Sequence, residues 1–422
     1  MEYALRQTAA IAGIGVEVHF LCMGMFPTER LSPRIKFTKI AMSNLPLWCG
    51  GKLQTIWRLT WVQFQNSMRV CKIFETGNFD AILFSCYKEY FAPFWVEPLR
   101  RLASKGAVIG TIAHDPVRDF VMGPLWWHRW CVRLGYSFVR HVFVHDDTPL
   151  DFGGGQPEGI QIHQIPHGPY ELEAAKVGRS EMRRRLGFDS KETTEIPENA
   201  RLSAVGRLAG QDGAGFLNPL TSKSLPVTPA LQDVVFLAFG QIRDGKNLDL
   251  FLKAMPNLPE HVKLLVVGKG DSSSSKAPQF YQKLADDLGV SHRCRWDIRR
   301  IPEQEVGDFF AAADMVILTY SANFRSASGV LSAAVSARRP VLSSSGEGPL
   351  KKAVQRYRLG VFVSPDDLDC IVQGARTLIN TFGNSRTSSM ATPEWELYEC
   401  ENSWEINANR VASALMIKLF GI

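Results

Sequence analysis

Short apolar runs alternate with segments of helical length along most of the chain, most regularly in its second half. There the runs begin at Val235, Val262, Met315, Val341 and Gly360. Bounded apolar runs of this kind are typical of buried strands, and the segments between them are long enough for crossover helices. The pattern therefore predicts an α/β domain with a parallel sheet covered by helices on both faces.

The first half shows the same alternation less regularly. Apolar runs predict strands at 16–22, 35–40, 80–86, 107–112, 141–145 and 161–165, and helices are predicted at 54–74, 91–104, 125–138 and 171–186. The segment 1–12 also predicts a helix, whereas a parallel sheet usually opens with a strand and a glycine-rich turn. We expect either that the domain lacks its first strand or that the reading frame starts late.

A chain of 422 residues is too long for one compact core, so two domains are expected. We predict two Rossmann-like domains that face a cleft, with the boundary in a stretch rich in Ser, Thr, Pro and Gly. The predicted parts are an N-terminal domain at 1–186, a partly disordered linker or insertion at 187–232, a C-terminal domain at 233–400 and a last helix at 401–422. Trp404 is expected to anchor that helix.

Composition narrows the class of protein. Hydrophobic residues make up 45% and charged residues 21%, which fits a globular protein. No apolar run approaches the roughly 20 residues of a spanning helix, and the eight cysteines are scattered without zinc-site spacing. We expect a cytoplasmic protein with reduced thiols, without a nucleic-acid partner. The net charge of +6 suits an anionic ligand or an anionic membrane surface, and a peripheral site at the inner membrane is the alternative location.

The segment around Ser326–Gly329 is the first candidate for chemistry. It follows the apolar run 315–318 and opens a helix rich in small residues. Unpaired backbone N–H groups and the helix dipole make such a helix start suitable for a phosphate. An ordinary strand–helix connection without a ligand is the alternative.

A second candidate follows the strand at 235–239. In Gly240-Gln-Ile-Arg-Asp-Gly-Lys, the glycine permits close approach of a ligand, and Arg243 and Lys246 could clamp phosphate oxygens. A solvated turn is the alternative. Neither a P-loop nor a dinucleotide fingerprint is present in the sequence.

Two histidines end strands in the first half, where ligands of open α/β sheets bind. His114 follows the strand at 107–112, and His167 follows the strand at 161–165. Each could hydrogen-bond a sugar hydroxyl or a phosphate, with Asp115 orienting His114. Structural roles in capping the loops are the alternative.

The segment 125–138 is rich in Trp and Arg, including Trp126, Trp127, Arg129 and Trp130. We interpret it as part of the core, with contact at a membrane interface as the alternative.

These features together resemble the two-Rossmann (GT-B) glycosyltransferases, and within them the retaining group 1 enzymes of bacterial polysaccharide and lipid-sugar assembly. The resemblance covers about 235–379. It rests on Gly240…Lys246-Asn, Ile301-Pro-Glu-Gln-Glu, Ala312-Ala-Asp-Met-Val-Ile-Leu-Thr-Tyr, Ser328-Gly-Val-Leu…Pro340-Val and Gly360-Val-Phe-Val-Ser-Pro-Asp-Asp-Leu. His114-Asp-Pro and Pro166-His-Gly-Pro-Tyr add weaker matches in the first half.

The resemblance implies a role for each of these positions. Lys246 and Arg243 would bind the donor diphosphate, and Ser328, Gly329 and Val330 would supply backbone N–H groups to it. Arg300 and Ile301 would meet the nucleotide base, and His114 would lie beside the transferred sugar. The family's usual pair of glutamates, separated by seven residues, is replaced by Arg325 and Ala333.

We therefore expect transfer of a sugar from a UDP- or GDP-linked donor to a glycan or lipid-linked acceptor, without a metal or other cofactor. The alternative is a catalytically inactive relative that binds or scaffolds within a glycan assembly pathway. The two missing glutamates and the late start both favour that alternative.

Overall fold

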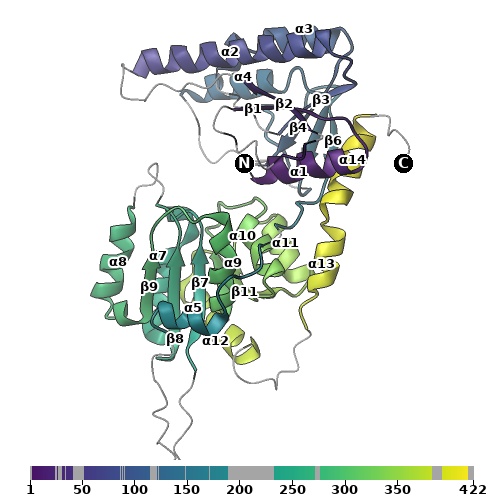
Figure 1. Cartoon of the computed structure of the whole chain (residues 1–422). Coiled ribbons are helices and arrows are strands. Elements are labelled where there is room, and N and C mark those ends of the chain that lie inside the picture. The colour runs from purple at the N-terminus through teal and green to yellow at the C-terminus, as the bar shows by residue number, and fades with distance from the viewer. Residues whose placement is uncertain are drawn as a thin grey trace, which may run out of the picture.

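In a computed structural model, the chain forms two lobes, with the N-terminal lobe above the C-terminal lobe in Figure 1. The structure describes residues 2–416 except for 24–25, 27–30, 34, 41–51, 86, 88, 90, 115–120, 122, 148, 171, 189–231, 271–275 and 383–391. The predicted linker at 187–232 therefore lies almost wholly outside the described residues.

The C-terminal lobe is built on a six-stranded parallel sheet in the order β12-β11-β10-β7-β8-β9. Its strands are β7 (Val234–Phe239), β8 (Val262–Val267), β9 (Cys294–Asp297), β10 (Met315–Thr319), β11 (Val341–Ser344) and β12 (Gly360–Phe362). Its helices are α7 (Leu248–Ala254), α8 (Pro278–Asp287), α9 (Glu303–Ala312), α10 (Gly329–Ser336), α11 (Pro349–Arg356) and α12 (Leu368–Phe382), with 3₁₀ turns η3 (Asp244–Lys246), η4 (Met255–Asn257) and η5 (Ser291–Arg293). The predicted parallel sheet with helical crossovers is confirmed.

Strand β7 shows why the apolar runs are continuous rather than alternating. Phe236 points into a core covered by α7, α8 and α12, whereas Val235 and Leu237 point into a second core covered by α9, α10 and α11. Side chains of a strand alternate between the two faces of a sheet, so a strand covered on both faces needs apolar residues at every position. Each fully buried side chain of this size contributes roughly 1.5–3 kcal/mol through the hydrophobic effect.

The strand order creates a switch point between β7 and β10. From β7 the chain adds β8 and β9 on one side, and it then returns to add β10, β11 and β12 on the other. The connections leaving the carboxyl ends of β7 and β10 therefore diverge, and a crevice opens where ligands of such sheets bind. The two candidate loops, 240–247 and 320–328, lie at this point.

The N-terminal lobe carries two parallel sheets in the described residues, β1-β2 and β3-β4-β5-β6. The strands are β1 (His19–Met23), β2 (Lys36–Ile40), β3 (Ala81–Phe84), β4 (Val108–Ala113), β5 (His141–Val144) and β6 (Gln161–Gln164). The helices are α1 (Glu2–Gly13), α2 (Lys52–Thr76), α3 (Glu97–Ser104) and α4 (Leu125–Gly135), with the 3₁₀ turn η2 (Ala92–Phe94) before α3. Among the helices described, none is both long and apolar enough to cross a membrane.

Helices cover the larger N-terminal sheet on both faces. Core residues of α2, α3 and α4 form one cluster with β3, β4 and β5, whereas α1 packs on the other face together with α14 (Trp404–Ala414). The interpretation of the segment 125–138 as core was wrong for two of its tryptophans. Trp126 and Trp130 of α4 are 66% and 45% exposed, because the buried side of the helix is formed by His128, Cys131 and Val132.

The segment after β6 crosses to the C-terminal lobe earlier than the sequence predicts. The expected helix at 171–186 is reduced to α5 (Arg179–Arg185), which packs against α9. The preceding residues are held extended by tertiary contacts: the backbone N–H of Val177 donates to Asp308 at 3.0 Å, and that of Leu172 donates to Ser336 Oγ at 3.4 Å. The described part of 172–188 therefore packs with the C-terminal lobe.

The chain end returns to the N-terminal lobe through α13 (Trp395–Glu401) and α14, as the yellow segment of Figure 1 shows. The predicted anchoring by Trp404 is confirmed. Its indole N–H donates to the carbonyl of Pro169 at 2.8 Å, and its ring leaves no room for a side chain at Gly168.

Candidate functional site

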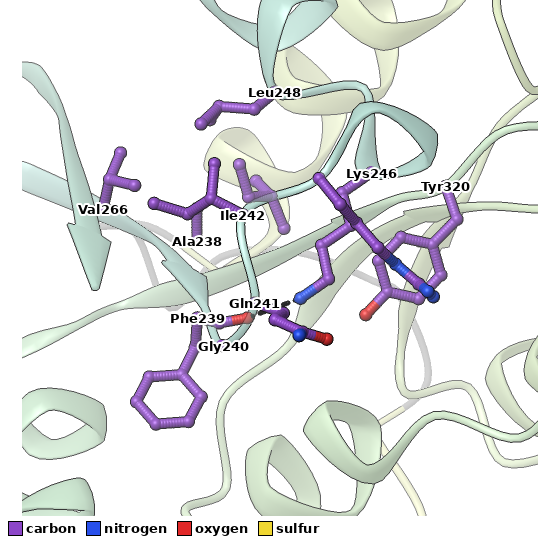
Figure 2. Close-up of a pocket in the computed structure, with 11 residues that line it drawn as sticks. Ala238, Phe239, Gly240, Gln241, Ile242, Lys246, Leu248, Val266 and Tyr320 are labelled. Atoms are coloured by element: carbon purple, nitrogen blue, oxygen red, sulfur yellow. Dashed lines mark hydrogen bonds between the residues drawn. The ribbon is translucent and has the colours of Figure 1, made fainter. Parts of the chain in front are cut away.

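Lys246 lies at the carboxyl end of β7 in a small pocket lined by Phe239, Gly240, Arg243 and Tyr320, among others. Figure 2 shows its side chain turned back toward the end of the strand, where its ammonium donates to the carbonyl of Phe239 at 3.0 Å. The ammonium also lies 5.9 Å from the centre of the Tyr320 ring, which closes one side of the pocket. A single carbonyl and a ring face leave an ammonium with unused donor capacity for an anion.

Burial and charge both disfavour the proton on Lys246. The pKa of Lys246 is lowered from 10.5 to about 8. Removal of the ammonium from water is the larger cause, and the neighbouring Arg243 guanidinium is the smaller one. A depressed lysine pKa caused by burial and a second cation marks a place where positive charge is concentrated before any ligand arrives. An anion bound there would relieve that repulsion.

The helix start at α10 lies beside this lysine. A Cβ atom built on Gly240, whose φ is +93°, would meet Lys246 Nζ at 3.3 Å and Val330 Cγ2 at 3.8 Å. Ser328 caps the helix by accepting from the backbone N–H of Leu331 at 3.3 Å, and its hydroxyl lies 3.2 Å from that of Tyr320. The lysine, the glycine turn and the first turn of α10 thus form one cationic site, lined by backbone amides, at the switch point.

Three histidines of the N-terminal lobe face this cationic site, and each lies just beyond the end of a strand. His145 follows β5, and its Nδ1 lies 3.3 Å from the carbonyl of Ile165, which can only accept. Burial, with the nearby His167 and His114, holds the pKa of His145 well below its usual value, so the ring is neutral. Its Nε2 is then an acceptor, and the Nδ1–H of His114 donates to it at 3.3 Å. This bond holds the ring of His114 against His145 at the end of β4.

His167 is fixed in the same way. Its Nδ1–H donates to the carbonyl of Gly168 at 3.0 Å, and its Nε2 lies 3.4 Å from the hydroxyl of Tyr170. The pKa of His167 is lowered to about 4, chiefly by burial and to a smaller extent by the charge of His114. His145 and His167 are therefore neutral near pH 7, and the nitrogens of both rings have defined hydrogen-bond partners.

One tyrosine of α1 organises the three rings. Tyr3 packs edge-on against His114, His145 and His167, with ring centroids 4.5, 5.2 and 5.2 Å away. Its hydroxyl accepts from the amide of Asn407 at 3.0 Å, and burial raises the pKa of Tyr3 far above 10. Among the described residues, no cluster of His, Cys, Asp or Glu side chains is arranged to hold a metal ion.

Contacts across the lobes join the two halves of the site. A Cβ at Gly329, the first residue of α10, would lie 2.6 Å from Cε2 of Tyr170, so this tyrosine covers the helix start. Lys352 of α11 reaches across to Asp146, which follows His145, with a separation of 2.7 Å. The histidines and the cationic site therefore belong to one region between the lobes.

The remaining predicted site residues lie further out. Arg243 is exposed at the pocket rim, and its charge is felt by both Lys246 and Tyr320. Arg300 is exposed in the loop between β9 and α9, two strands away from β7, while Ile301 packs against the core. Asp115 lies outside the described residues.

Residues 233–381 match the family model described as "Glycosyl transferases group 1". The C-terminal lobe is a group 1 glycosyltransferase domain. The match spans the whole switch-point region, including the loop of Lys246 and the start of α10. The resemblance recognised in the sequence is thereby confirmed for this lobe.

Curated proteins similar to this chain are named D-inositol 3-phosphate glycosyltransferase. The protein of Thermomonospora curvata is 27% identical over 288 residues, which are 63% of this chain and 64% of the relative. That of Mycobacterium marinum is 27% identical over 186 residues, 43% of this chain and 37% of the relative. The chain thus spans less than two thirds of the length of these relatives.

Solved structures extend the likeness to both lobes. Sucrose-phosphate synthase from Thermosynechococcus elongatus matches with a TM-score of 0.65 at 14% identity, covering 98% of this chain and 92% of that one. Anabaena HepE in complex with UDP and glucose matches with a TM-score of 0.62 at 15% identity, covering 98% and 95%. At these identities the likeness shows the fold, and the expected two-lobed GT-B architecture is confirmed.

The two positions that depart from the group 1 pattern are placed differently. Ala333 is 6% exposed and faces the core from the middle of α10. Arg325 is exposed in the loop before α10, and its backbone lies against Gly348. A carboxylate at position 333 would be buried among apolar groups. Position 333 therefore serves packing in this chain.

Three residues of the site were missed by sequence reasoning. His145 ends a strand just as His114 and His167 do, so the same argument was open for it. Tyr320 and Tyr170 also follow strands, but an aromatic ring there carries no signal that separates a ligand contact from a core contact. The structure assigns them to the site by their contacts with Ser328 and Gly329.

Proposed function

We propose that the protein transfers a sugar from a nucleotide-diphosphate donor to a glycan or lipid-linked acceptor. The observation that carries the proposal is the position of Lys246 beside Gly240 and the start of α10, at the switch point of a group 1 domain. Anabaena HepE, which shares the fold, was solved with UDP and with UDP-glucose, and this supports a UDP-linked donor.

Positive charge at this place would act on the leaving group. As the bond from the sugar to the diphosphate breaks, negative charge grows on the diphosphate oxygens. Lys246, Arg243 and the N–H groups of Ser328, Gly329 and Val330 would stabilise that charge more strongly in the transition state than in the bound donor. We propose that these groups meet the charge without a metal ion.

The histidines would serve the sugar and the acceptor. We expect the ring of His114, which His145 holds in place, to hydrogen-bond a sugar hydroxyl. The hydroxyl of Tyr170 lies 3.4 Å from Nε2 of His167. The new bond forms between the anomeric carbon and the acceptor oxygen, whose proton is released. The resemblance to retaining enzymes predicts an unchanged anomeric configuration, which an NMR spectrum of the product would establish.

The test is release of nucleoside diphosphate from UDP- and GDP-sugars by the full chain, with and without glycan and lipid-linked acceptors. Lys246→Ala and Arg243→Ala should each weaken donor binding, and losing one charge-assisted contact predicts roughly a tenfold effect or more. Lys253→Ala, an exposed lysine on α7 of the same lobe, is the matched control. Full donor binding by the double variant would rule out this site.

The absence of carboxylates at positions 325 and 333 supports a second candidate, a relative that binds the donor without turnover. The same assay separates the two. Binding of a nucleotide-sugar that depends on Lys246, without product for any acceptor or water, would favour the binding protein.

A further inference from the structure

Exposed apolar side chains are concentrated on one part of the N-terminal lobe. Of the fifteen large hydrophobic residues that are exposed in the described residues, nine lie on α2, α4 and η2. We call this surface the tryptophan face; it consists of Ile56, Trp57, Leu59, Trp61, Met68, Phe94, Leu125, Trp126 and Trp130. Single exposed apolar residues are ordinary, but a concentration of this size marks a contact surface.

Spacing along each helix aligns the exposed rings. On α2, Trp57, Trp61 and Met68 are 71%, 54% and 49% exposed and are separated by four and seven residues. On α4, Trp126 and Trp130 are separated by four. Residues at these separations lie on the same side of a helix. Each helix therefore presents a ladder of rings to solvent rather than to the protein.

The elements of the tryptophan face are packed side by side on one core. Core residues of α2, α3 and α4 belong to a single cluster. Trp127 links α4 to η2, with its ring 6.3 Å from that of Phe94 and 5.3 Å from that of Trp130. In Figure 1 these helices lie on the side of the N-terminal lobe that faces away from the C-terminal lobe. The tryptophan face is thus separate from the candidate site.

The charges on these helices are almost all positive. The sequence of α2 contains Arg58, Arg69 and Lys72, and that of α4 contains Arg129 and Arg133. Within the two helices the acidic residue is Glu75, which is paired with Lys105 at 2.8 Å. A surface of exposed indole rings among arginines has the composition of a membrane–water interface, where rings sit at headgroup level and cations meet phosphates.

We propose that the tryptophan face docks on a membrane surface rich in anionic lipid. The cations favour an anionic partner, and exposed indole rings on two helices beside these cations suit a lipid headgroup layer. The proposal does not depend on the transferase activity, because no residue of the tryptophan face belongs to the candidate site. Docking through this surface would leave the candidate site turned away from the membrane.

The experiment is co-sedimentation of the full chain with vesicles of phosphatidylcholine alone or mixed with phosphatidylglycerol. Wild type should bind the anionic vesicles and lose binding as salt is raised. Trp57→Ser/Trp126→Ser should weaken binding at least tenfold, since fully buried aromatic rings are among the largest apolar contributors. Arg129→Gln/Arg133→Gln should weaken it about fivefold for each cation. Phe280→Ser, a change at an exposed aromatic residue of α8, should have no effect.

Melting temperatures would show that each variant is folded, and the arginine pair tests the proposal separately from the tryptophans. Wild type that fails to sediment with anionic vesicles would overturn the proposal. So would unchanged binding by both double variants. A wild-type dimer that Trp57→Ser/Trp126→Ser dissociates, without any vesicle binding, would instead assign the tryptophan face to contact between copies of the chain.

Discussion

The depressed pKa of Lys246 predicts how donor affinity changes with pH. In the unliganded protein this pKa is about 8, because the ammonium is buried and lies near Arg243. Relative to its ordinary value of 10.5, the shift corresponds to a cost on the order of 3 kcal/mol for holding the charge. A bound diphosphate reverses the balance, since it favours the charged form and raises the pKa of Lys246.

The sign follows from proton linkage. Binding requires the protonated lysine, so affinity is full below the unliganded pKa and falls as pH rises through it. The protonated fraction drops from about nine tenths at pH 7 to about one tenth at pH 9, so affinity for a nucleotide-sugar should fall about tenfold over that interval. The diphosphate of a nucleotide-sugar has no titrating group in this range, so its own charge stays constant.

Isothermal titration calorimetry at several pH values measures the effect, and buffers of different ionisation enthalpy report the proton taken up on binding. Lys246→Arg should flatten the profile, because a guanidinium stays charged at pH 9. Lys246→Met should bind weakly at every pH. Arg243→Gln should move the inflection to higher pH, because it removes the neighbouring cation. A wild-type profile that is flat from about pH 7 to pH 9, or a Lys246→Met profile that keeps the slope, would refute the reasoning.

Three further predictions follow from the contacts of the site and its support. His145→Leu removes the acceptor for His114, so kcat/KM should fall about fivefold, and the Nδ1 chemical shift of His114 should change; an unchanged shift would contradict this hydrogen bond. Asp314→Asn should destabilise the C-terminal lobe by about 3–5 kcal/mol in urea unfolding, because Arg183 is 4% exposed and loses its 2.5 Å ion pair; a change below about 1 kcal/mol would contradict a buried pair. Gly329→Ala should raise the KM for the donor, because its methyl group would displace the tyrosine ring that covers the helix start; an unchanged KM would contradict that packing.

The alternation of apolar runs was enough to predict nearly every strand and helix of both lobes, because a parallel sheet covered on both faces requires continuous apolar strands. The segment 171–186 shows where local reasoning fails. Its composition favours a helix, but the carbonyl of Glu173 lies so close to Gly307 of α9 that a Cβ there would be 2.3 Å away. Contacts with a helix more than a hundred residues later keep this backbone extended, and no local pattern reports them.

Candidate residues were predictable where a strand end and a distinctive side chain coincide, as for His114, His167 and Lys246. The contacts among them were not predictable. The orientation of His114 depends on His145, and the position of His145 depends on the carbonyl of Ile165, which follows the neighbouring strand. Such chains of hydrogen bonds depend on strand order and register, which cannot be predicted from local sequence patterns.

The replacement of the two glutamates also changes the electrostatics of the proposed donor site. Where a carboxylate is usual in the family, this chain has Arg325 in the loop that leads into α10, so the loops at the switch point carry Arg243, Lys246 and Arg325. Positive charge held in advance at a partly buried place stabilises a departing diphosphate, but it provides no acceptor for donor hydroxyls. The histidine rings of the N-terminal lobe can hydrogen-bond those hydroxyls. We therefore expect contacts to the donor sugar to come chiefly from the N-terminal lobe, so that donor binding and lobe closure are coupled through Tyr170.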